Sequence, residues 1–290
     1  MTDAIGPRGG RPVSAAPGLP QTGGVAGPAE VGGPGEPVVV VARDADAVGR
    51  LAAIQVVEAT TAAVAERGRA DLALTGGSTP PAMYRHLVEP ALRDRVDWER
   101  VHLWWGDDRF VRRADEHSNL SLADERLLAA DGIPIPTTSV HLFPTDRALD
   151  DGLGADWCAA TYATEVAAAL PLIDGWPSFD LVIVGIGGDG HLLSVFPGSP
   201  ALSSDRIGLA VPAPTHIAPA RDRVTLNPAI LGSARAVLAT ATGAGKAAVV
   251  ARILEGPRDP ATLPGVLARR SGGTWILDRE AASRLSRRGD

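Results

Sequence analysis

The chain has 290 residues, a formal net charge of −6 at pH 7, and a single cysteine, Cys158. This length fits one large α/β domain, because such folds often run to about 250 residues as one unit. One cysteine excludes an internal disulfide, and we interpret Cys158 as a buried packing residue. The negative charge and the lack of a basic stripe argue against nucleic-acid binding, whereas a small anionic ligand needs only a few well-placed cations.

The first 37 residues are rich in Gly and Pro and almost free of large apolar side chains. Such a segment buries too little apolar surface to offset the entropy of ordering it. We therefore predict a disordered tail over residues 1–37 and one catalytic domain over residues 38–290. The tail lacks the apolar run of a secretory signal, and we find no later run of the roughly 18 apolar residues that cross a bilayer. We expect a cytoplasmic protein with no membrane partner.

After the tail, short apolar runs alternate with longer amphipathic ones. This pattern predicts an α/β fold with a single doubly wound, mostly parallel sheet flanked by helices. In chain order, the expected strands are 37–42, 71–74, 101–105, 139–143, 180–185, 223–226, 236–241 and 274–277. The expected helices are 46–66, one that begins near Pro80, one that runs from Ser118 through Leu128, 155–170, 245–254 and 279–285. The strand at 180–185 is the most apolar, which predicts burial on both faces.

Ligands of open α/β sheets bind outside the carboxyl ends of the strands, so loops that follow strands are the candidate sites. The first such loop is Thr75-Gly76-Gly77-Ser78-Thr79-Pro80. Gly76 and Gly77 let the backbone approach a ligand, and Ser78 offers a hydroxyl near the start of a helix. The loop fits an anion cradle, and it equally fits an ordinary helix cap after a tight turn.

A second loop, residues 105–110, contains Asp107, Asp108 and Arg109. Carboxylates suit sugar hydroxyls, and arginine suits bidentate contacts to a phosphate. The alternative is a solvated loop in which an aspartate and the arginine form a local ion pair.

The third loop, Gly185-Ile186-Gly187-Gly188-Asp189-Gly190-His191, matches the G-x-G-x-x-G dinucleotide pattern. That pattern requires a following helix and a distant acid, but the prolines Pro197 and Pro200 end any helix after about two turns. We therefore discount a nicotinamide site. Instead, the imidazole of His191 can take a proton from water as a general base, and the carboxylate of Asp189 can orient it. A purely structural histidine is the alternative interpretation.

Other chemistries have no support in the sequence. No G-x-S-x-G elbow of a serine esterase is present. The remaining histidines show no zinc-binding spacing, so we expect no metal site; they are His86, His102, His117, His141 and His216.

Taken together, these motifs resemble the 6-phosphogluconolactonase family, within the wider superfamily of sugar-phosphate isomerases and deaminases. The matching segments, in the family's order, are 74–80, 107–111 with 118–119, 187–191 with 196–198, 223–226, 242–247 and 275–278. The resemblance spans about residues 38–285, so only the predicted tail lies outside it.

The resemblance implies hydrolysis of 6-phospho-D-glucono-1,5-lactone to 6-phosphogluconate, in the pentose phosphate pathway, without a metal or organic cofactor. By the same resemblance, His191 matches the family's base and Asp189 its neighbouring acid. The residues that fall where the family holds the phosphate and sugar are Gly76, Gly77, Ser78, Asp108, Arg109, Gly187, Gly188, Arg223 and Lys246.

Two positions depart from the family pattern. Asp108 replaces the usual glutamate and is one methylene shorter, and Leu192 lacks the hydroxyl of the usual threonine beside His191. One rival is an amino-sugar-6-phosphate deaminase, in which a glutamate follows the histidine closely; residues 192–200 contain no acid, which favours the lactonase. The other is a non-catalytic sugar-phosphate sensor, which would need a DNA-binding helix pair that the tail does not offer. The sequence does not distinguish a monomer from a homodimer.

Overall fold

The computed structural model describes residues 30–31, 35–77 and 79–286. The strands are β1 (Glu30–Val31), β2 (Val38–Ala42), β3 (Ala70–Leu74), β4 (Val101–Trp105), β5 (Asp107–Arg109), β6 (Leu172–Ile173), β7 (Trp176–Pro177), β8 (Leu181–Gly185), β9 (Gly208–Val211), β10 (Arg223–Leu226), β11 (Ala236–Ala241) and β12 (Gly273–Asp278). The α-helices are α1 (Ala45–Arg67), α2 (Pro80–Leu87), α3 (Pro90–Arg93), α4 (Asn119–Arg126), α5 (Thr145–Asp150), α6 (Ala155–Ala169), α7 (Ile230–Ser233) and α8 (Ala247–Glu255). The 3₁₀ helices are η1 (Trp98–Arg100), η2 (Thr137–Ser139), η3 (Pro200–Ser203), η4 (Ala244–Lys246) and η5 (Pro264–Ala268).

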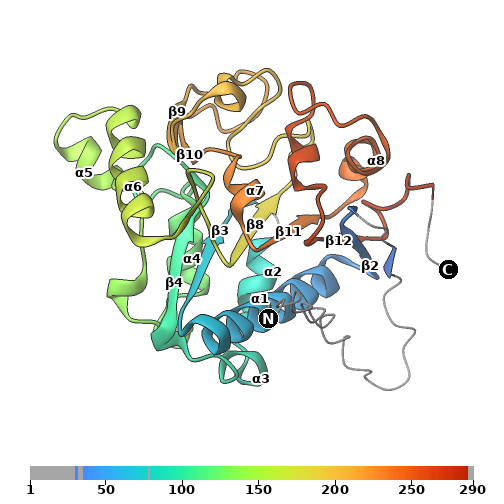
Figure 1. Ribbon diagram of the computed structural model, residues 1–290, viewed down its shortest axis with the longest axis horizontal. Coiled ribbons are helices and arrows are strands. Elements are labelled where there is room, and N and C mark those ends of the chain that lie inside the picture. The colour runs from blue at the N-terminus through green and yellow to red at the C-terminus, as the bar shows by residue number, and fades with distance from the viewer. Residues whose placement is uncertain (1–29, 32–34, 78, 287–290) are drawn as a thin grey trace, which may run out of the picture.

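The main sheet has seven strands in the order β1-β2-β12-β11-β8-β3-β4. All neighbouring strands run parallel except β1, which pairs antiparallel with β2. Figure 1 shows α1, α2 and α3 on one side of the strands and α7 and α8 on the other. The apolar residues Leu181–Val184 of the central strand are all buried, as a strand covered on both faces requires. The mostly parallel α/β fold is thus confirmed.

The direction of winding reverses between β3 and β8. From β3 the chain proceeds outward to β4, whereas from β8 it proceeds in the opposite direction to β11 and β12. The connections that leave β3 and β8 therefore run in opposite directions along the sheet, and a crevice opens between them at the carboxyl ends of these strands. The first and third candidate loops, which follow β3 and β8, both line this crevice.

Helix α1 spans one face of the sheet and contacts β3, β11 and β12. It begins where the Asp44 side chain accepts a hydrogen bond from the Ala47 amide at 2.8 Å, and it ends at Gly68, whose φ of 77° is left-handed. Contrary to the sequence-based expectation, this helix is long and apolar enough, by length and composition alone, to cross a membrane. Its apolar residues serve the core of the domain, because buried residues such as Val48, Val56 and Val57 pack there.

A second, three-stranded antiparallel sheet has the order β5-β10-β9. Residues 107–109 were expected in a loop, but they pair as β5 with β10, and β9 was not expected at all. A strand of three polar residues is too short to show an alternating pattern, which explains why the sequence did not reveal it.

Two predicted elements are wrong. Residues 139–143 form no strand beyond a single bridge between Val140 and Leu103, and Ser139 is the last residue of η2. Residues 279–285 form turns rather than a helix. The carboxylate of Asp278 accepts hydrogen bonds from both the Gly243 and the Ala281 amides, which fixes a turn at the end of β12.

The predicted disordered tail falls mainly on residues outside the described part of the chain. Its described residues contact the domain: Glu30–Val31 pair with β2, and Glu36 forms an ion pair with Arg269 at 2.7 Å. Contacts of the described residues with the domain therefore begin before residue 37, and the domain boundary at that residue stays a prediction.

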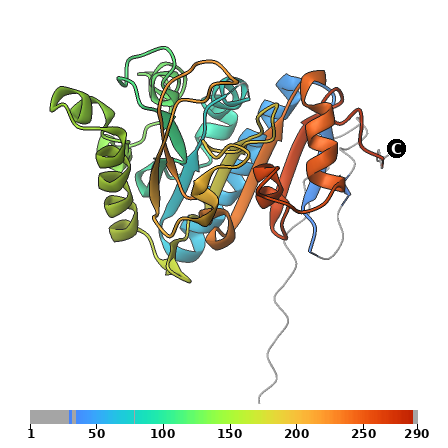
Figure 2. The same ribbon diagram turned by 90° about the horizontal axis from the view of Figure 1, so that it is seen from above.

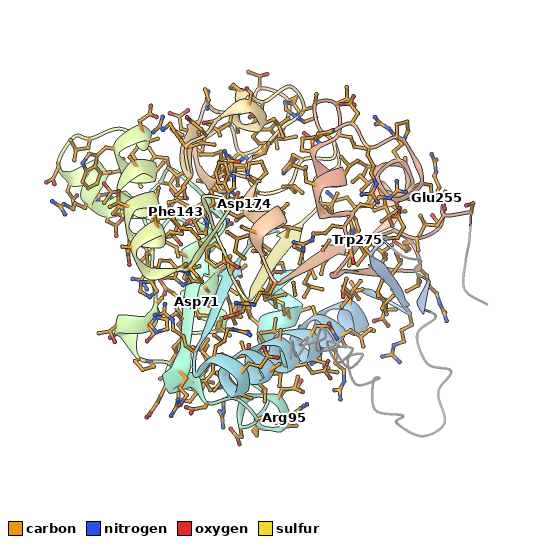
Figure 3. The ribbon with its side chains drawn as sticks, in the orientation of Figure 1. Asp71, Arg95, Phe143, Asp174, Glu255 and Trp275 are labelled. Atoms are coloured by element: carbon orange, nitrogen blue, oxygen red, sulfur yellow. The ribbon has the colours of Figure 1, made fainter. Side chains whose placement is uncertain are left out.

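The core extends through the whole molecule. Figure 2 places α5 and α6 at the β4 end of the sheet and α8 at the β12 end. Trp275 on β12 is fully buried, and Arg95 lies at the periphery of the molecule (Figure 3). Cys158 on α6 is also fully buried, and burial raises the pKa of its thiol to about 12, so it is a packing residue as expected.

Candidate active site

A cavity of about 180 Å³ lies at the carboxyl ends of β3, β8 and β11. It is lined by seven of the predicted site residues, which are Gly76, Gly77, Arg109, Gly187, His191, Arg223 and Lys246. Asp108, Gly188 and Asp189 are not part of the lining, and Ser78 lies outside the described residues. The fold therefore brings together residues that are far apart in the sequence at one crevice.

His191 and Asp189 form the centre of the third loop. The Nδ1 atom of His191 lies 2.5 Å from Oδ1 of Asp189, which also accepts the His191 amide at 3.1 Å. Gly187 lies directly under the imidazole, because a Cβ at this position would collide with His191 Nδ1. Glycine at 187 is thus a condition for the histidine to lie where it does.

The electrostatics of Asp189 favour its ionised form. Partial burial alone would raise the pKa of this carboxyl, but hydrogen bonds from His191 and from His216 outweigh burial and hold the pKa well below its usual range. An ionised Asp189 accepts the Nδ1 proton of His191, which leaves Nε2 as the unprotonated nitrogen. No partner for Nε2 exists among the described residues, so it is available to a group in the cavity.

Arg109 and Arg223 are neighbours across the small sheet. Their Cα atoms pair in the register of β5 and β10, and the Nε atom of each is buried without a hydrogen-bond partner in the described structure. Burial and the nearby charge of Arg109 lower the pKa of Arg223, while Asp107 and Asp108 partly offset this. Like charges directly opposite each other destabilise a sheet. An anion in the cavity would relieve both the repulsion and the missing hydrogen bonds.

The carbonyl oxygens of the surrounding loops hold these guanidinium groups in place. Arg109 Nη1 donates to the carbonyl of His117, and Arg223 Nη2 donates to the carbonyl of Pro219 at 3.0 Å. Each arginine is therefore anchored on one side and free to bind on another.

Asp108 supports the second loop and does not line the cavity. It is fully buried and accepts hydrogen bonds from Ser118 Oγ and from the amides of Arg109 and Asn119. Burial raises its pKa to about 6, although these hydrogen bonds oppose the shift. The predicted contact of Asp108 with substrate has no support in this geometry, and neither does an ion pair with the Arg109 guanidinium. Its shorter side chain positions the loop instead.

The first loop presents free backbone amides. The amides of Gly76 and Gly77 have no acceptor among the described residues. Gly76 packs so closely on Asn119 that a Cβ there would collide with the Asn119 side chain. This leaves Gly76 and Gly77 as amide donors toward the cavity, in agreement with the anion-cradle interpretation.

Lys246 lies on the His191 side of the cavity. Its Nζ would be 3.9 Å from a Cβ built on Gly188, and no hydrogen bond to this ammonium occurs in the described part of the chain. Burial lowers its pKa, and the charge of Asp189 partly opposes that shift. Lys246 is therefore a cation next to the loop that carries His191.

Asp107 and Phe196 lie in segments singled out from the sequence, but their contacts at the site, and the place of His216 there, were not predicted. Asp107 accepts a hydrogen bond from Ser194 Oγ at 2.6 Å, Phe196 packs 4.7 Å from the His191 ring, and His216 lies 2.7 Å from Asp189. No spacing signal links these positions, because they come together only in the fold. Leu192, in contrast, is fully buried in the main core, so the missing hydroxyl there leaves the Asp189–His191 hydrogen bond intact.

Within residues 30–31, 35–77 and 79–286, no group of three or more His, Cys, Asp or Glu side chains is arranged to hold an ion. The described cavity lining contains an imidazole suited to proton transfer, that of His191, and guanidinium groups suited to binding an anion, those of Arg109 and Arg223.

A doubly wound sheet whose switch point carries an oriented imidazole and two arginines with unbonded Nε atoms defines a class of protein: an α/β enzyme for acid–base chemistry on small anionic substrates. The comparisons with known proteins narrow this class. A family model described as "Glucosamine-6-phosphate isomerases/6-phosphogluconolactonase" matches residues 43–277. The chain belongs to this family.

Individual relatives agree with the family match. The chain is 39% identical to a 6-phosphogluconolactonase from Mycobacterium tuberculosis over 246 residues, which are 83% of this chain and 96% of that protein. It is 37% identical to a 6-phosphogluconolactonase from Streptomyces coelicolor, with 87% of this chain and 95% of that protein covered. The solved structure of 6-phosphogluconolactonase from Trypanosoma brucei superposes with a TM-score of 0.75 at 30% identity, covering 87% of this chain and 100% of that chain.

Proposed function

We propose that the chain hydrolyses 6-phospho-D-glucono-1,5-lactone to 6-phosphogluconate, with His191 as the general base. The observation that carries the proposal is the His191 ring, which lines the cavity with Nδ1 bonded to Asp189 and with Nε2 unbonded among the described residues. The relatives named 6-phosphogluconolactonase support the choice of substrate.

The phosphate of the substrate binds at Arg109 and Arg223. Their unpaired Nε atoms and mutual repulsion are relieved by a dianion, and the amides of Gly76 and Gly77 add further donors. With the phosphate fixed, the lactone ring extends toward His191 and Lys246.

The reaction needs one base and one water molecule. Nε2 of His191 takes a proton from water as the water oxygen attacks the lactone carbonyl carbon, and the carbonyl oxygen becomes negatively charged. The ring C–O bond then breaks, and the leaving oxygen takes the proton back from His191. The products are the carboxylic acid, which ionises in solution, and a free hydroxyl. Because a lactone is a reactive ester, general-base help of about 10²- to 10⁴-fold plus positioning is sufficient.

Lys246 stabilises the charge that develops on the carbonyl oxygen. The resemblance placed it among the phosphate- and sugar-binding residues, but its position beside Gly188 and Asp189 supports a role at the reacting end. The Gly188 amide has no acceptor among the described residues and is a second donor on the same side.

The cavity disfavours the rival deaminase. Ring opening and proton shuttling in that family use a glutamate near the histidine. Among the described residues that line this cavity, Asp107 is the only acid, and its Oδ2 already accepts the Ser194 hydroxyl. The cavity thus offers one base rather than a base and a separate acid.

The test is acid release from freshly prepared 6-phosphogluconolactone, measured above its spontaneous hydrolysis, alongside ammonium release from glucosamine 6-phosphate. We expect strong acceleration of the first reaction and none of the second. Ammonium release without lactone hydrolysis would overturn the proposal in favour of the deaminase.

The proposal also keeps two expectations from the sequence, namely that residues 38–290 form the catalytic domain and that the protein is cytoplasmic.

A further inference from the structure

The carboxylate of Asp189 has two imidazole partners. Oδ1 faces His191 Nδ1 at 2.5 Å, and Oδ2 faces His216 Nε2 at 2.7 Å. Only the first partner is part of the glycine-rich loop, since His216 belongs to the segment between β9 and β10. Both oxygens of the carboxylate are therefore bonded, by groups from two different loops.

A carboxylate bonded through one oxygen retains rotational freedom about its last side-chain torsion. A second hydrogen bond on the other oxygen restricts that rotation and fixes the plane in which Oδ1 meets His191. The donors also keep Asp189 ionised, as the low pKa of this carboxyl indicates. The orientation of His191 thus depends on a residue that the imidazole itself does not touch.

Phe196 reinforces the arrangement from the side. Its ring packs 4.7 Å from the ring of His191 and meets the ring of His216 edge-on at 5.7 Å, with an interplanar angle of 86°. The two imidazoles and the phenyl ring fix one another around Asp189, and Phe196 also lines the cavity.

The segment that carries His216 is attached to the site at a second point. Arg223 Nη2 donates to the carbonyl of Pro219, and Ile217 and Ala218 between these contacts line the cavity. The placement of His216 therefore does not depend on the Asp189 contact alone.

We propose that His216 is a positioning residue for the reaction: by donating from Nε2 to Asp189 Oδ2, it fixes the carboxylate that holds His191 with Nε2 toward the cavity. This inference rests on the proposed function. It adds a third member to the Asp189–His191 pair, recruited from a loop that the sequence motif does not include.

The first test compares two substitutions at one position. His216→Ala removes the donor, and His216→Gln keeps a donor at a similar distance from the backbone but cannot ionise. We expect His216→Ala to lower kcat for 6-phosphogluconolactone by about 10-fold with KM changed by less than about 2-fold, and His216→Gln to retain most of kcat. Equal losses in both variants, or an unchanged kcat in His216→Ala, would overturn the proposal.

A matched control is His86→Ala. His86 also bonds to carboxylates, those of Asp46 and Glu89, but it lies on α2 and does not line the cavity. We expect it to lower stability without lowering kcat, measured well below the unfolding temperature.

The second test is a double-mutant cycle with Asp189→Ala. Because His216 acts through Asp189, His216→Ala should have no further effect on kcat in the Asp189→Ala background. The same 10-fold loss in both backgrounds would show that His216 acts by another route, and the proposal would fail.

A third measurement needs no substrate. In the full-length, ligand-free protein, the Nδ1 proton of His191 should give a far-downfield ¹H NMR signal that persists in His216→Gln and broadens or disappears in His216→Ala. If the wild-type protein does not hydrolyse the lactone, the proposed function fails, yet this signal still decides whether His216 positions the pair. A signal that is identical in all three proteins would overturn the inference.

Discussion

Two pairs of histidines adjoin a carboxylate in different regions of the described structure. At the cavity, Asp189 lies between His191 and His216. On the edge strand β4, His102 Nδ1 lies 2.9 Å from His141 Nε2, and His141 Nδ1 lies 2.6 Å from Glu165. The residue types are the same, but their surroundings differ.

In the β4 group most polar atoms are bonded within the fold, although Nε2 of His102 has no partner among the described residues. Both nitrogens of His141 are bonded, and its ring stacks on Trp104 at 3.8 Å and 7°. The indole nitrogen of Trp104 donates in turn to Asp71 on β3. This group packs α6 and β4 together and adjoins no described part of the cavity lining.

The cavity group retains unused hydrogen-bonding capacity. Nε2 of His191, Nε of Arg109 and of Arg223, and Nζ of Lys246 all lack partners among the described residues, and all four side chains line one cavity. Since buried polar groups are normally paired, such a concentration indicates binding and chemistry rather than packing. The two regions contain similar types of residue, but the cavity region has more polar atoms without a hydrogen-bond partner in the described structure.

The largest expected effect is that of His191→Ala, which removes the base. We expect kcat to fall by about 10²- to 10⁴-fold with a small change in KM, measured as acid release from the lactone. The matched change His141→Ala should leave kcat within a few-fold, at a temperature where that variant is folded. An unaltered rate in His191→Ala would remove the distinction between the two regions.

Lys246→Ala should have the next largest effect. Loss of a donor to the developing oxyanion lowers kcat by about 10²-fold or more. A raised KM with nearly unchanged kcat would instead indicate a phosphate anchor, as the family resemblance implied. Steady-state kinetics over a range of substrate concentrations separates these outcomes.

Arg223→Gln should act on binding. Loss of a charge-assisted hydrogen bond to phosphate raises KM by about 10- to 100-fold and leaves kcat within a few-fold. The ligand-free variant should be no less stable than wild type in thermal unfolding, because the repulsion from Arg109 is removed. The exposed Arg112, which pairs with Asp150, provides the control Arg112→Gln, with no expected change in KM. A large loss of stability in Arg223→Gln would mean that this arginine is structural.

The smallest expected effect is on the pH dependence of the free energy of unfolding, through His102 of the β4 group. Burial, aided by the charges of Arg69 and His141 and opposed by that of Asp71, lowers the pKa of His102. The unfolded chain then binds this proton more tightly than the folded one, so the free energy of unfolding should fall as pH drops below about 6.5. Urea unfolding at several pH values should show a weaker decrease in His102→Gln. An identical pH dependence in both proteins would contradict the burial argument.

Features formed by residues close together in the sequence could be predicted, whereas contacts between distant segments could not. The Asp189–His191 pair lies two residues apart after an apolar strand, and both the strand and the loop are confirmed. The pairing of Arg109 with Arg223 depends on a three-residue strand with no readable period, so it could not be predicted. His216 meets Asp189 across 27 residues without any regular spacing. The predicted helix at 279–285 is wrong: the Asp278 side chain accepts the Ala281 amide, as a helix cap would, but the segment continues as turns.

The contact between Gly187 and His191 limits which substitutions position 187 can tolerate. Every amino acid other than glycine carries a Cβ, and any Cβ at position 187 would collide with the imidazole. No missense change in that codon is therefore compatible with the base in its place, although residue 187 contributes no side chain to the reaction. Selection on the chemistry of His191 should appear in populations as the absence of variation at a neighbouring glycine.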